Sequence, residues 1–153
     1  MEAKTLPYLQ AVIYEGLRIH PPFTGLLCKK VPPEGDTYDG KFIPGGTRIA
    51  HSTWSIMRNK QVFGEDVEVF RPERWLGIDD ARRTTMERTV DLAFGYGRWA
   101  CAGKTVSFME LNKFYVELLR HFDFQLVNPT QPWHSVNQGF FLQKDMWVKV
   151  TER

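Results

Sequence analysis

Cysteine is scarce in this chain of 153 residues, and the charges of the two signs nearly cancel. The two cysteines, Cys28 and Cys101, lie far apart, with no cysteine or histidine at the short spacings of a zinc site. Neither a disulfide framework nor a structural zinc module is therefore indicated. The 20 Lys and Arg against 18 Asp and Glu leave a net charge of +2. This balance is unlike that of a nucleic-acid-binding arm or an acidic tail, so we expect no nucleic-acid partner.

Long apolar runs are also missing. No stretch approaches the roughly 18 residues of a membrane span, and the N-terminal residues do not have the form of a signal peptide. The sequence therefore predicts a soluble chain with no membrane segment. Hydrophobic residues nevertheless make up 42% of the chain, which is enough to predict a folded core rather than disorder.

Helical periodicity is clear in two segments. Residues 6–20 carry apolar side chains at helical spacing and end at a pair of prolines, and about residues 103–121 carry an apolar stripe opposite charged side chains. A short helix is predicted within residues 52–58. Periodic signals are few between residues 59 and 97, which predicts a long irregular meander that is functional or wrapped around something.

Short runs of β-favouring residues occupy much of the remainder. Residues 26–51 predict a small sheet, in which Asp39-Gly40 marks a tight hairpin turn. Strands are predicted near residues 122–127, 140–143 and 147–151, with Lys144-Asp145 as a turn between the last two. Together with the helices, these runs predict an α+β fold with short antiparallel sheets.

The segment 94–103, Phe-Gly-Tyr-Gly-Arg-Trp-Ala-Cys-Ala-Gly, is the strongest candidate for chemistry. Cys101 stands where the long helix is predicted to begin, and the unpaired N–H groups of a helix N-terminus favour a thiolate, which is a good ligand or nucleophile. Gly97 and Gly103 lack a Cβ and let backbone pass close to a flat, bulky partner. The alternative is that Cys101 is buried and inert. A nucleophilic cysteine would also need a neighbouring base, and no histidine is near Cys101 in sequence. Cys28 is given a structural role.

Two charged patterns are weak when each is taken alone. Glu15 and Arg18 lie three residues apart on the first predicted helix, as in many solvated ion pairs. Arg74 belongs to the run Arg71-Pro72-Glu73-Arg74-Trp75, which by itself is only a charged turn beside an aromatic residue.

Taken together and in this order, the patterns resemble the cytochrome P450 family of haem-thiolate monooxygenases. Residues 15–18 are similar to its ExxR helix, residues 72–75 to its PERF or PERW loop, and residues 94–103 to its cysteine-ligand loop. The resemblance covers nearly the whole chain and implies the C-terminal part of the fold, so that residues 1–153 would form a partial domain without the membrane anchor and the distal oxygen-activation helix. The sequence around the cysteine most resembles that of fungal members of the pisatin demethylase type, which implies fungal secondary metabolism.

The resemblance also implies roles for individual residues. Cys101 would be the axial ligand of the iron of haem b (iron protoporphyrin IX), with further cofactor contacts from Phe94, Gly97, Arg98, Trp99 and Gly103. A structural network would join Glu15, Arg18 and Arg74. Substrate contacts would come from Phe23, Thr24, Gly25, Leu26, Phe140 and Phe141. The chain departs from the family at Trp99, where the usual residue is an arginine that pairs with a haem propionate, and Lys29 or Lys30 would then supply the charge.

The implied reaction inserts one oxygen atom from O2 into a hydrophobic small molecule, with electrons from NADPH through NADPH-cytochrome P450 reductase. A full-length relative is implied at the endoplasmic reticulum membrane. Because the distal machinery has no counterpart, we expect no turnover from this chain alone. The alternatives are a truncated, non-catalytic fragment that does not bind haem and, less favoured, a small cysteine enzyme or metal module.

Overall fold

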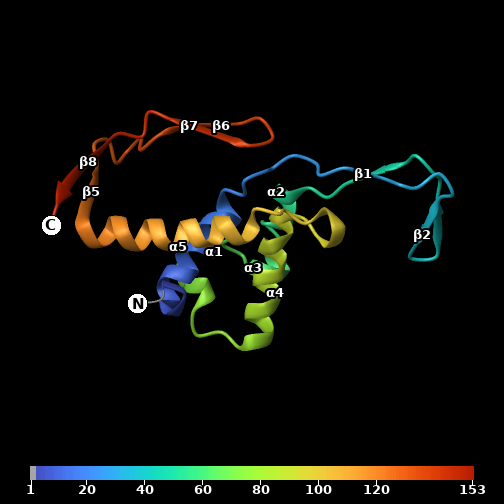
Figure 1. Cartoon of the computed structure of the whole chain (residues 1–153), viewed down its shortest axis with the longest axis horizontal. Coiled ribbons are helices and arrows are strands. Elements are labelled where there is room, and N and C mark those ends of the chain that lie inside the picture. The colour runs from blue at the N-terminus through green and yellow to red at the C-terminus, as the bar shows by residue number, and fades with distance from the viewer. Residues whose placement is uncertain (1–2) are drawn as a thin grey trace.

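The structure is a computed structural model that describes residues 3–153 as helices joined to four two-stranded antiparallel sheets. The helix α1 (Pro7–Ile19) contacts both α5 (Lys104–His121) and α4 (Asp80–Asp91), and these three helices form the centre of the molecule (Figure 1). The sheets extend from this centre as two arms, with β2 and the C-terminal strands at opposite ends. The mixed α and β composition agrees with the predicted fold class.

The predicted N-terminal helix is present and follows a short 3-10 turn, η1 (Ala3–Thr5). Pro7 occupies the first turn of α1, where its missing N–H has no intrahelical partner to lose. The predicted short helix corresponds to α2 (Thr53–Ile56), whose N-cap Ser52 accepts a hydrogen bond from the Ser55 N–H. The next helix, α3 (Lys60–Phe63), is capped in the same way by Asn59.

The strands pair as four separate antiparallel ladders: β1 (Lys29–Lys30) with β4 (Arg48–Ile49), β2 (Asp36–Tyr38) with β3 (Lys41–Ile43), β5 (Phe122–Leu126) with β8 (Val148–Glu152), and β6 (His134–Asn137) with β7 (Phe141–Lys144). The hairpin turn predicted at Asp39-Gly40 is confirmed, since both residues have positive φ, 50° and 71°.

The predicted pairing at the C-terminus is wrong. We expected the last two strands to be joined by the turn at Lys144-Asp145, but β7 pairs with β6, and β8 pairs with β5. The strand β6 was not predicted, because its sequence His-Ser-Val-Asn holds a single apolar residue and shows no alternation. A strand of this kind is specified by its partner rather than by its own pattern.

The predicted irregular meander is also partly wrong, because it contains the 12-residue helix α4. Only Met86 and Val90 of α4 are buried, and the rest of the helix apart from Ala81 is charged or polar, so its helical signal rests on two large apolar positions. Asp79, whose side chain accepts the Arg82 N–H, was the available start signal. The meander also holds the 3-10 turns η2 (Pro72–Trp75), η3 (Leu92–Phe94) and η4 (Gly97–Trp99).

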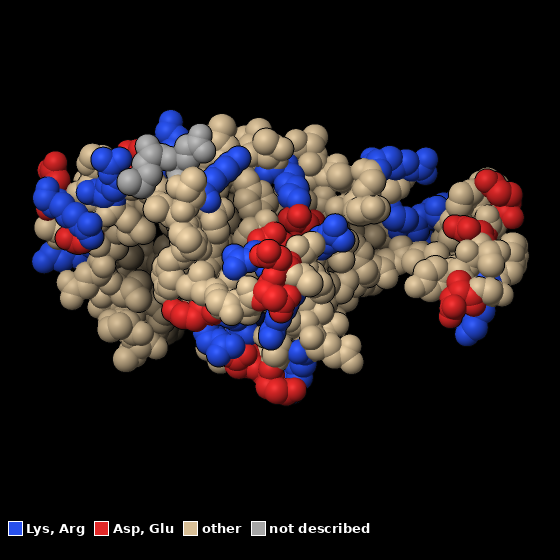
Figure 2. All heavy atoms as spheres, turned by 90° about the horizontal axis from the view of Figure 1, so that it is seen from below, with Lys and Arg blue, Asp and Glu red and all other residues tan. Residues whose placement is uncertain are grey.

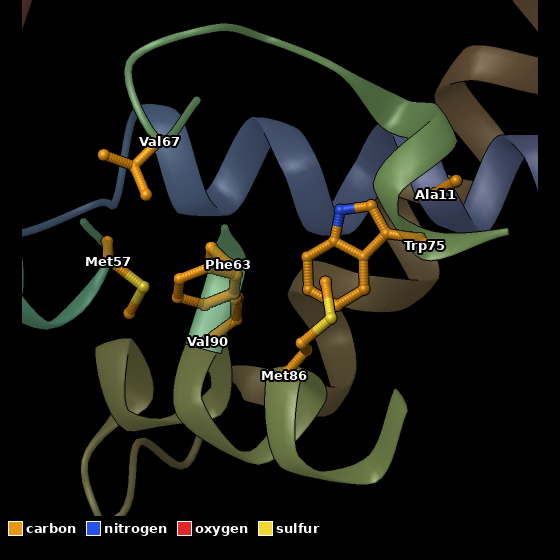
Figure 3. Packing of buried hydrophobic residues seen from close by; sticks show 7 residues of the cluster. All are labelled: Ala11, Met57, Phe63, Val67, Trp75, Met86 and Val90. Carbon is orange, nitrogen blue, oxygen red and sulfur yellow. The ribbon is translucent and has the colours of Figure 1, made fainter. Parts of the chain in front are cut away.

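The main hydrophobic core lies between α1 and the meander, including its helix α4 (Figure 3). Its buried members are Ala11, Met57, Phe63, Val67, Trp75, Met86 and Val90. The Trp75 ring lies 5.2 Å from that of Tyr14 and 6.2 Å from that of Phe63, measured between centroids. The meander is therefore held by a core to which it contributes most of the side chains.

The long helix α5 packs less deeply than its predicted apolar stripe suggested. Its one buried side chain among the described residues is the polar Asn112, whose Oδ1 accepts from Gln10 Nε2 at 2.7 Å. Met109 and Phe114 are more than half exposed. An apolar groove of about 760 Å³ runs along α5 and the end of α1 between Leu17 and Leu118. None of the helices in residues 3–153 is long and apolar enough to cross a membrane.

Charges of both signs are interspersed on the face seen in Figure 2. Lys and Arg alternate with Asp and Glu over the middle of this face, and much of the neighbouring surface carries neither. This face therefore presents no broad field of one sign.

Candidate functional site

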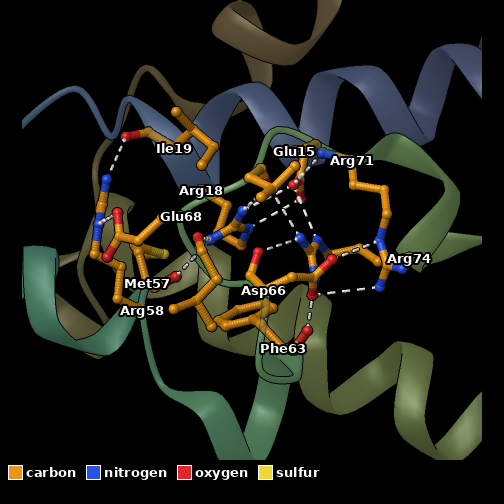
Figure 4. Close-up of polar contacts among 12 residues, drawn as sticks. Glu15, Arg18, Ile19, Met57, Arg58, Phe63, Asp66, Glu68, Arg71 and Arg74 are labelled. Atoms are coloured by element: carbon orange, nitrogen blue, oxygen red, sulfur yellow. Dashed lines mark hydrogen bonds and ion pairs between the residues drawn. The ribbon is translucent and has the colours of Figure 1, made fainter.

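A buried ionic network joins the first helix to the meander. The Glu15 side chain is fully buried and accepts from Arg18 Nε at 2.9 Å and Nη2 at 2.8 Å. It also accepts from Arg74 Nε at 2.9 Å, the Arg71 backbone N–H at 2.8 Å and the Trp75 indole N–H at 2.9 Å. The structure thus brings the predicted Glu15, Arg18 and Arg74 together, as Figure 4 shows. The carboxylate is the hub of donors that come from two distant segments.

The two guanidinium groups of this network donate hydrogen bonds to backbone carbonyls of residues 57–69. Arg18 donates to the carbonyls of Met57, Val67 and Val69 at 3.1, 2.6 and 3.1 Å. Arg74 donates to those of Phe63, Asp66 and Val69 at 2.6, 3.0 and 3.0 Å. These carbonyls have no strand or long helix to pair with, so the arginines satisfy groups that would otherwise be buried and unpaired. The network therefore fixes the path of residues 57–69.

Electrostatics keep the hub charged. Burial alone would raise the pKa of Glu15, but hydrogen bonds from Arg18, the Arg71 backbone and Trp75 outweigh it, so this pKa lies below its ordinary value. A hydrogen bond from Arg74 similarly lowers the pKa of Asp66, whose carboxylate also binds Arg71 at 2.9 Å. Sequence reasoning missed Asp66 and Trp75 as network members. Both stand near the charged turn, but no local pattern states which way their side chains point.

The cysteine loop is shaped by close backbone contacts. The Cys101 N–H donates to the Phe94 carbonyl at 2.6 Å, and the buried Phe94 ring lies 5.8 Å from the ring of Phe108 on α5. Gly95, which follows Phe94 in the loop, has φ of 76° and ψ of −172°, a conformation essentially restricted to glycine. A Cβ at Gly95 would stand 2.5 Å from the Trp99 carbonyl oxygen. Sequence reasoning singled out Gly97 and Gly103, whereas Gly95 is the glycine that the loop most requires.

Gly95→Ala is therefore expected to disrupt the cysteine loop. The strained backbone conformation alone should cost about 1–3 kcal/mol, and the clash with the Trp99 carbonyl adds to it. Hydrogen–deuterium exchange of the Cys101 amide measures the loss, because this N–H is held by Phe94 in the intact loop. Gly97→Ala is the matched control, since Gly97 also has positive φ but a Cβ there meets nothing within 4 Å. Equal exchange in the two variants would contradict the clash.

Cys101 is exposed and faces a cavity of about 780 Å³. Apolar and aromatic side chains from the cysteine loop and from the β1–β4 region line the cavity together with cationic ones: Leu27, Lys29, Lys30, Val31, Ile49, His51, Phe94, Tyr96 and Trp99. A Cβ added at Gly103 would lie 3.7 Å from the Cys101 Sγ, so the sulfur lies beside the start of α5. An open thiol, an apolar wall and nearby cations fit a flat apolar group that carries an iron and acidic substituents.

Other chemistries of Cys101 have less support from the geometry. His51 lines the same cavity, but its buried Nε2 has no hydrogen-bond partner within residues 3–153, so it is not poised as a base on the thiol. Over the same residues, no three His, Cys, Asp or Glu side chains gather as a metal site. Cys28, by contrast, is half-buried and directly precedes β1.

The two segments predicted to contact substrate meet in space. The N–H groups of Thr24 and Gly25 donate to the Gly139 carbonyl at 2.7 and 3.2 Å. The Thr24 hydroxyl donates to Asn137 Oδ1 at 2.6 Å, and the same oxygen accepts the Gly139 N–H at 3.1 Å. The loop before β7 is thus latched to the segment after α1.

The aromatic and aliphatic members of these segments do not all take the same position. Phe23, Leu26 and Phe140 are exposed. Phe141 is instead half-buried against the end of α1, with its ring edge-on to His20 at 4.6 Å and 5.9 Å from the ring of Trp54. Phe141 therefore anchors β7 rather than offering a free face.

Thr24→Val should loosen this latch. Valine keeps the shape of threonine but removes the hydroxyl that Asn137 accepts, at an expected cost of about 1 kcal/mol. Amide hydrogen exchange at Gly25 and Gly139 should become faster while that of α4 is unchanged. Thr24→Ser keeps the hydroxyl and should retain the wild-type exchange. A serine variant that loosens as much as valine would show that the hydroxyl bond to Asn137 does not hold the latch.

Comparisons with known proteins agree with one another. The family description "Cytochrome P450" matches residues 2–150. Relatives named cytochrome P450 monooxygenase ABA1 in Pyricularia oryzae and aba1 in Botryotinia fuckeliana are 58% and 54% identical over 151 residues. Each match covers 99% of this chain, but the chain spans only 30% of the relative's length.

A solved structure, retinoic acid bound cyanobacterial CYP120A1, superposes with a TM-score of 0.78 at 26% identity, over 99% of this chain and 34% of that one. Its helices and small sheets therefore correspond to those described above. The family match over residues 2–150 and the superposed fold show that this chain belongs to the cytochrome P450 family and corresponds to the C-terminal portion of its fold.

Proposed function

We propose that this chain supplies the haem-thiolate segment of a cytochrome P450 monooxygenase, in which the Cys101 thiolate would hold the haem iron. One observation carries the proposal: the Cys101 side chain is exposed at the wall of a cavity of about 780 Å³, at the end of a loop held by the Phe94 carbonyl. A structural cysteine is usually buried instead.

The haem group, when bound through a cysteine thiolate, supplies the electron-rich iron at which O2 is reduced and its O–O bond is cleaved. One oxygen atom enters a C–H bond of the substrate and the other leaves as water, with the electron pair taken from NADPH and two protons taken from solvent. We propose NADPH-cytochrome P450 reductase as the carrier of these electrons and the endoplasmic reticulum membrane as the location of a full-length relative.

The residues of this chain hold and orient rather than react. Gly95 lets the loop turn close to the Trp99 carbonyl, and the Cys101 N–H is fixed on Phe94, which sets where the sulfur stands. Backbone N–H groups near the sulfur stabilise its negative charge. The network around Glu15 braces the meander that leads into this loop, so its role is structural.

A hydrophobic small molecule is the proposed substrate class. The exposed Phe23, Leu26 and Phe140 present apolar surface on the two latched segments, and such surface seeks an apolar partner. This part of the proposal rests on the family resemblance together with that exposure.

Haem reconstitution followed by optical spectroscopy tests the proposal. The reduced carbon monoxide complex should show the red-shifted Soret band of a thiolate-ligated iron, both in this chain and in the Pyricularia oryzae relative with its matching segment exchanged for this chain. A band in the exchanged relative alone would support the ligand and make the isolated chain the non-catalytic fragment. The absence of the band from both would overturn the proposal.

A further inference from the structure

The indole ring of Trp99 has two cationic side chains beside it at the edge of the Cys101 cavity. Lys29 Nζ lies 4.8 Å from the centroid of the Trp99 ring, and Arg98 Cζ lies 4.9 Å from it. Both distances are within the roughly 6 Å at which a cation is attracted to an aromatic ring. Lys29 comes from β1 and Trp99 from η4, so the contact joins distant segments of the chain. The electron-rich face of the ring attracts both cations.

The cations at this edge have no acidic partner in the described part of the chain. None of Lys29, Lys30 and Arg98 takes part in the ion pairs found within residues 3–153. Asp36 is the one acid in the wall of the cavity, and its carboxylate accepts the N–H of the following residue, Thr37. The positive charge at this edge is thus available to an anion.

A second polar group at the same cavity also lacks a partner. His51 Nε2 is buried and has no hydrogen bond within the described residues, and His51 lines the cavity together with Lys29, Lys30 and Trp99. A buried polar atom without a partner is costly, so a ligand with oxygen atoms would satisfy it. Two independent features, unpaired cations and an unpaired ring nitrogen, therefore point to an acidic group at one edge of an otherwise apolar cavity.

We propose that Trp99 is a positioning residue that holds the Lys29 ammonium at this edge for a propionate carboxylate of the haem, with Arg98 adding positive potential on the same ring. The inference rests on the proposed function, because it places the porphyrin at Cys101. It accounts for Trp99 at the position where the resemblance to the family implies a propionate-pairing arginine: the ring orients a charge from β1 instead of carrying one itself.

The test compares iron protoporphyrin IX with its dimethyl ester, in which both carboxylates are uncharged. Each is titrated by Soret absorbance into the chain and into the exchanged relative described above. Trp99→Leu should weaken binding of the free acid by about threefold to tenfold, and change that of the ester by less than twofold. Trp99→Phe keeps an aromatic face and should lie between, and Trp99→Arg should recover the affinity for the free acid by supplying a charge directly.

A double-mutant cycle with Lys29→Met isolates the positioning role. In the Lys29→Met background, Trp99→Leu should have a smaller effect on the free acid, because the ring then has Arg98 alone beside it. The ester is the internal control for folding, since a misfolded loop would lose both porphyrins equally.

Equal losses for the two porphyrins, or an undiminished Trp99 effect without Lys29, would overturn the inference and leave the proposed function standing. Wild-type protein that binds neither porphyrin would overturn both.

Discussion

Glu15→Gln is expected to lower the free energy of unfolding by about 3–5 kcal/mol, the usual cost of removing one partner from a buried ion pair. The reason is that Glu15 is the hub of the network, and its neutral replacement leaves Arg18 buried without a carboxylate. The new amide N–H₂ would also face donors that now find an acceptor, including the Trp75 indole. Residues 57–69 should lose their order first, because both arginines bind their carbonyls.

Urea unfolding followed by far-UV circular dichroism measures this loss. Glu65→Gln is the matched control: it breaks the exposed pair with Lys60 and should leave the unfolding midpoint unchanged. If the Glu15 variant unfolds at the same urea concentration as the control, the network does not stabilise the fold.

Acid unfolding is a second test of the contribution of Glu15 to stability. The pKa of Glu15 in the folded chain is below its ordinary value of 4.5, so its contribution is fully present above about pH 4.5. As the pH falls below this value, the unfolded state takes up the proton first, and the contribution is lost progressively until the folded-state pKa is passed. Over this window the stability of the wild type should therefore fall more steeply than that of Glu15→Gln.

Cys101→Ser should abolish the thiolate-type Soret band of the reduced carbon monoxide complex altogether. A serine hydroxyl keeps the shape of the side chain but is a far poorer ligand than a thiolate and does not donate the same electron density to iron. Because Cys101 is exposed on the surface of its loop, the fold itself should survive the change. The effect is thus expected on the spectrum and on haem retention, with little change in the far-UV signal.

Cys28→Ser is the control for this substitution, since it removes the other thiol of the chain while leaving the loop intact. It should retain the thiolate-type band in full. If the Cys28 variant loses the band and the Cys101 variant keeps it, the assignment of the axial ligand is wrong.

The local signals predicted much of the fold because they report on local physics. The Asp39-Gly40 turn, the Ser52 cap and the helix at Pro7 each depend on backbone preferences of a few adjacent residues. The helix α4 and the strand β6 were missed because each contributes only one or two apolar residues to the packing. Their stability comes from partners that are distant in sequence, and no window of adjacent residues contains them.

The candidate site divides in the same way. Cys101 and its glycine-rich surroundings could be named from the sequence, since a cysteine beside a helix start has recognisable chemistry. Gly95 could not be singled out among its neighbours, because its necessity lies in the contact with the Trp99 carbonyl across the loop. The roles of Asp66 and Trp75 in the network could not be predicted for a similar reason, because their side-chain directions are set by how the meander wraps around α1.

By itself, the sequence determined which residues carry charge, which turns are tight and which cysteine precedes the long helix, and so it determined the family. Only the tertiary structure decided that the Glu15 carboxylate would receive donors from two segments, that Thr24 would be latched to Asn137, and that Lys29 would lie over the Trp99 ring. The physical reason is that burial and pairing are properties of distant groups brought together, and their free energies arise only when the chain has closed around them.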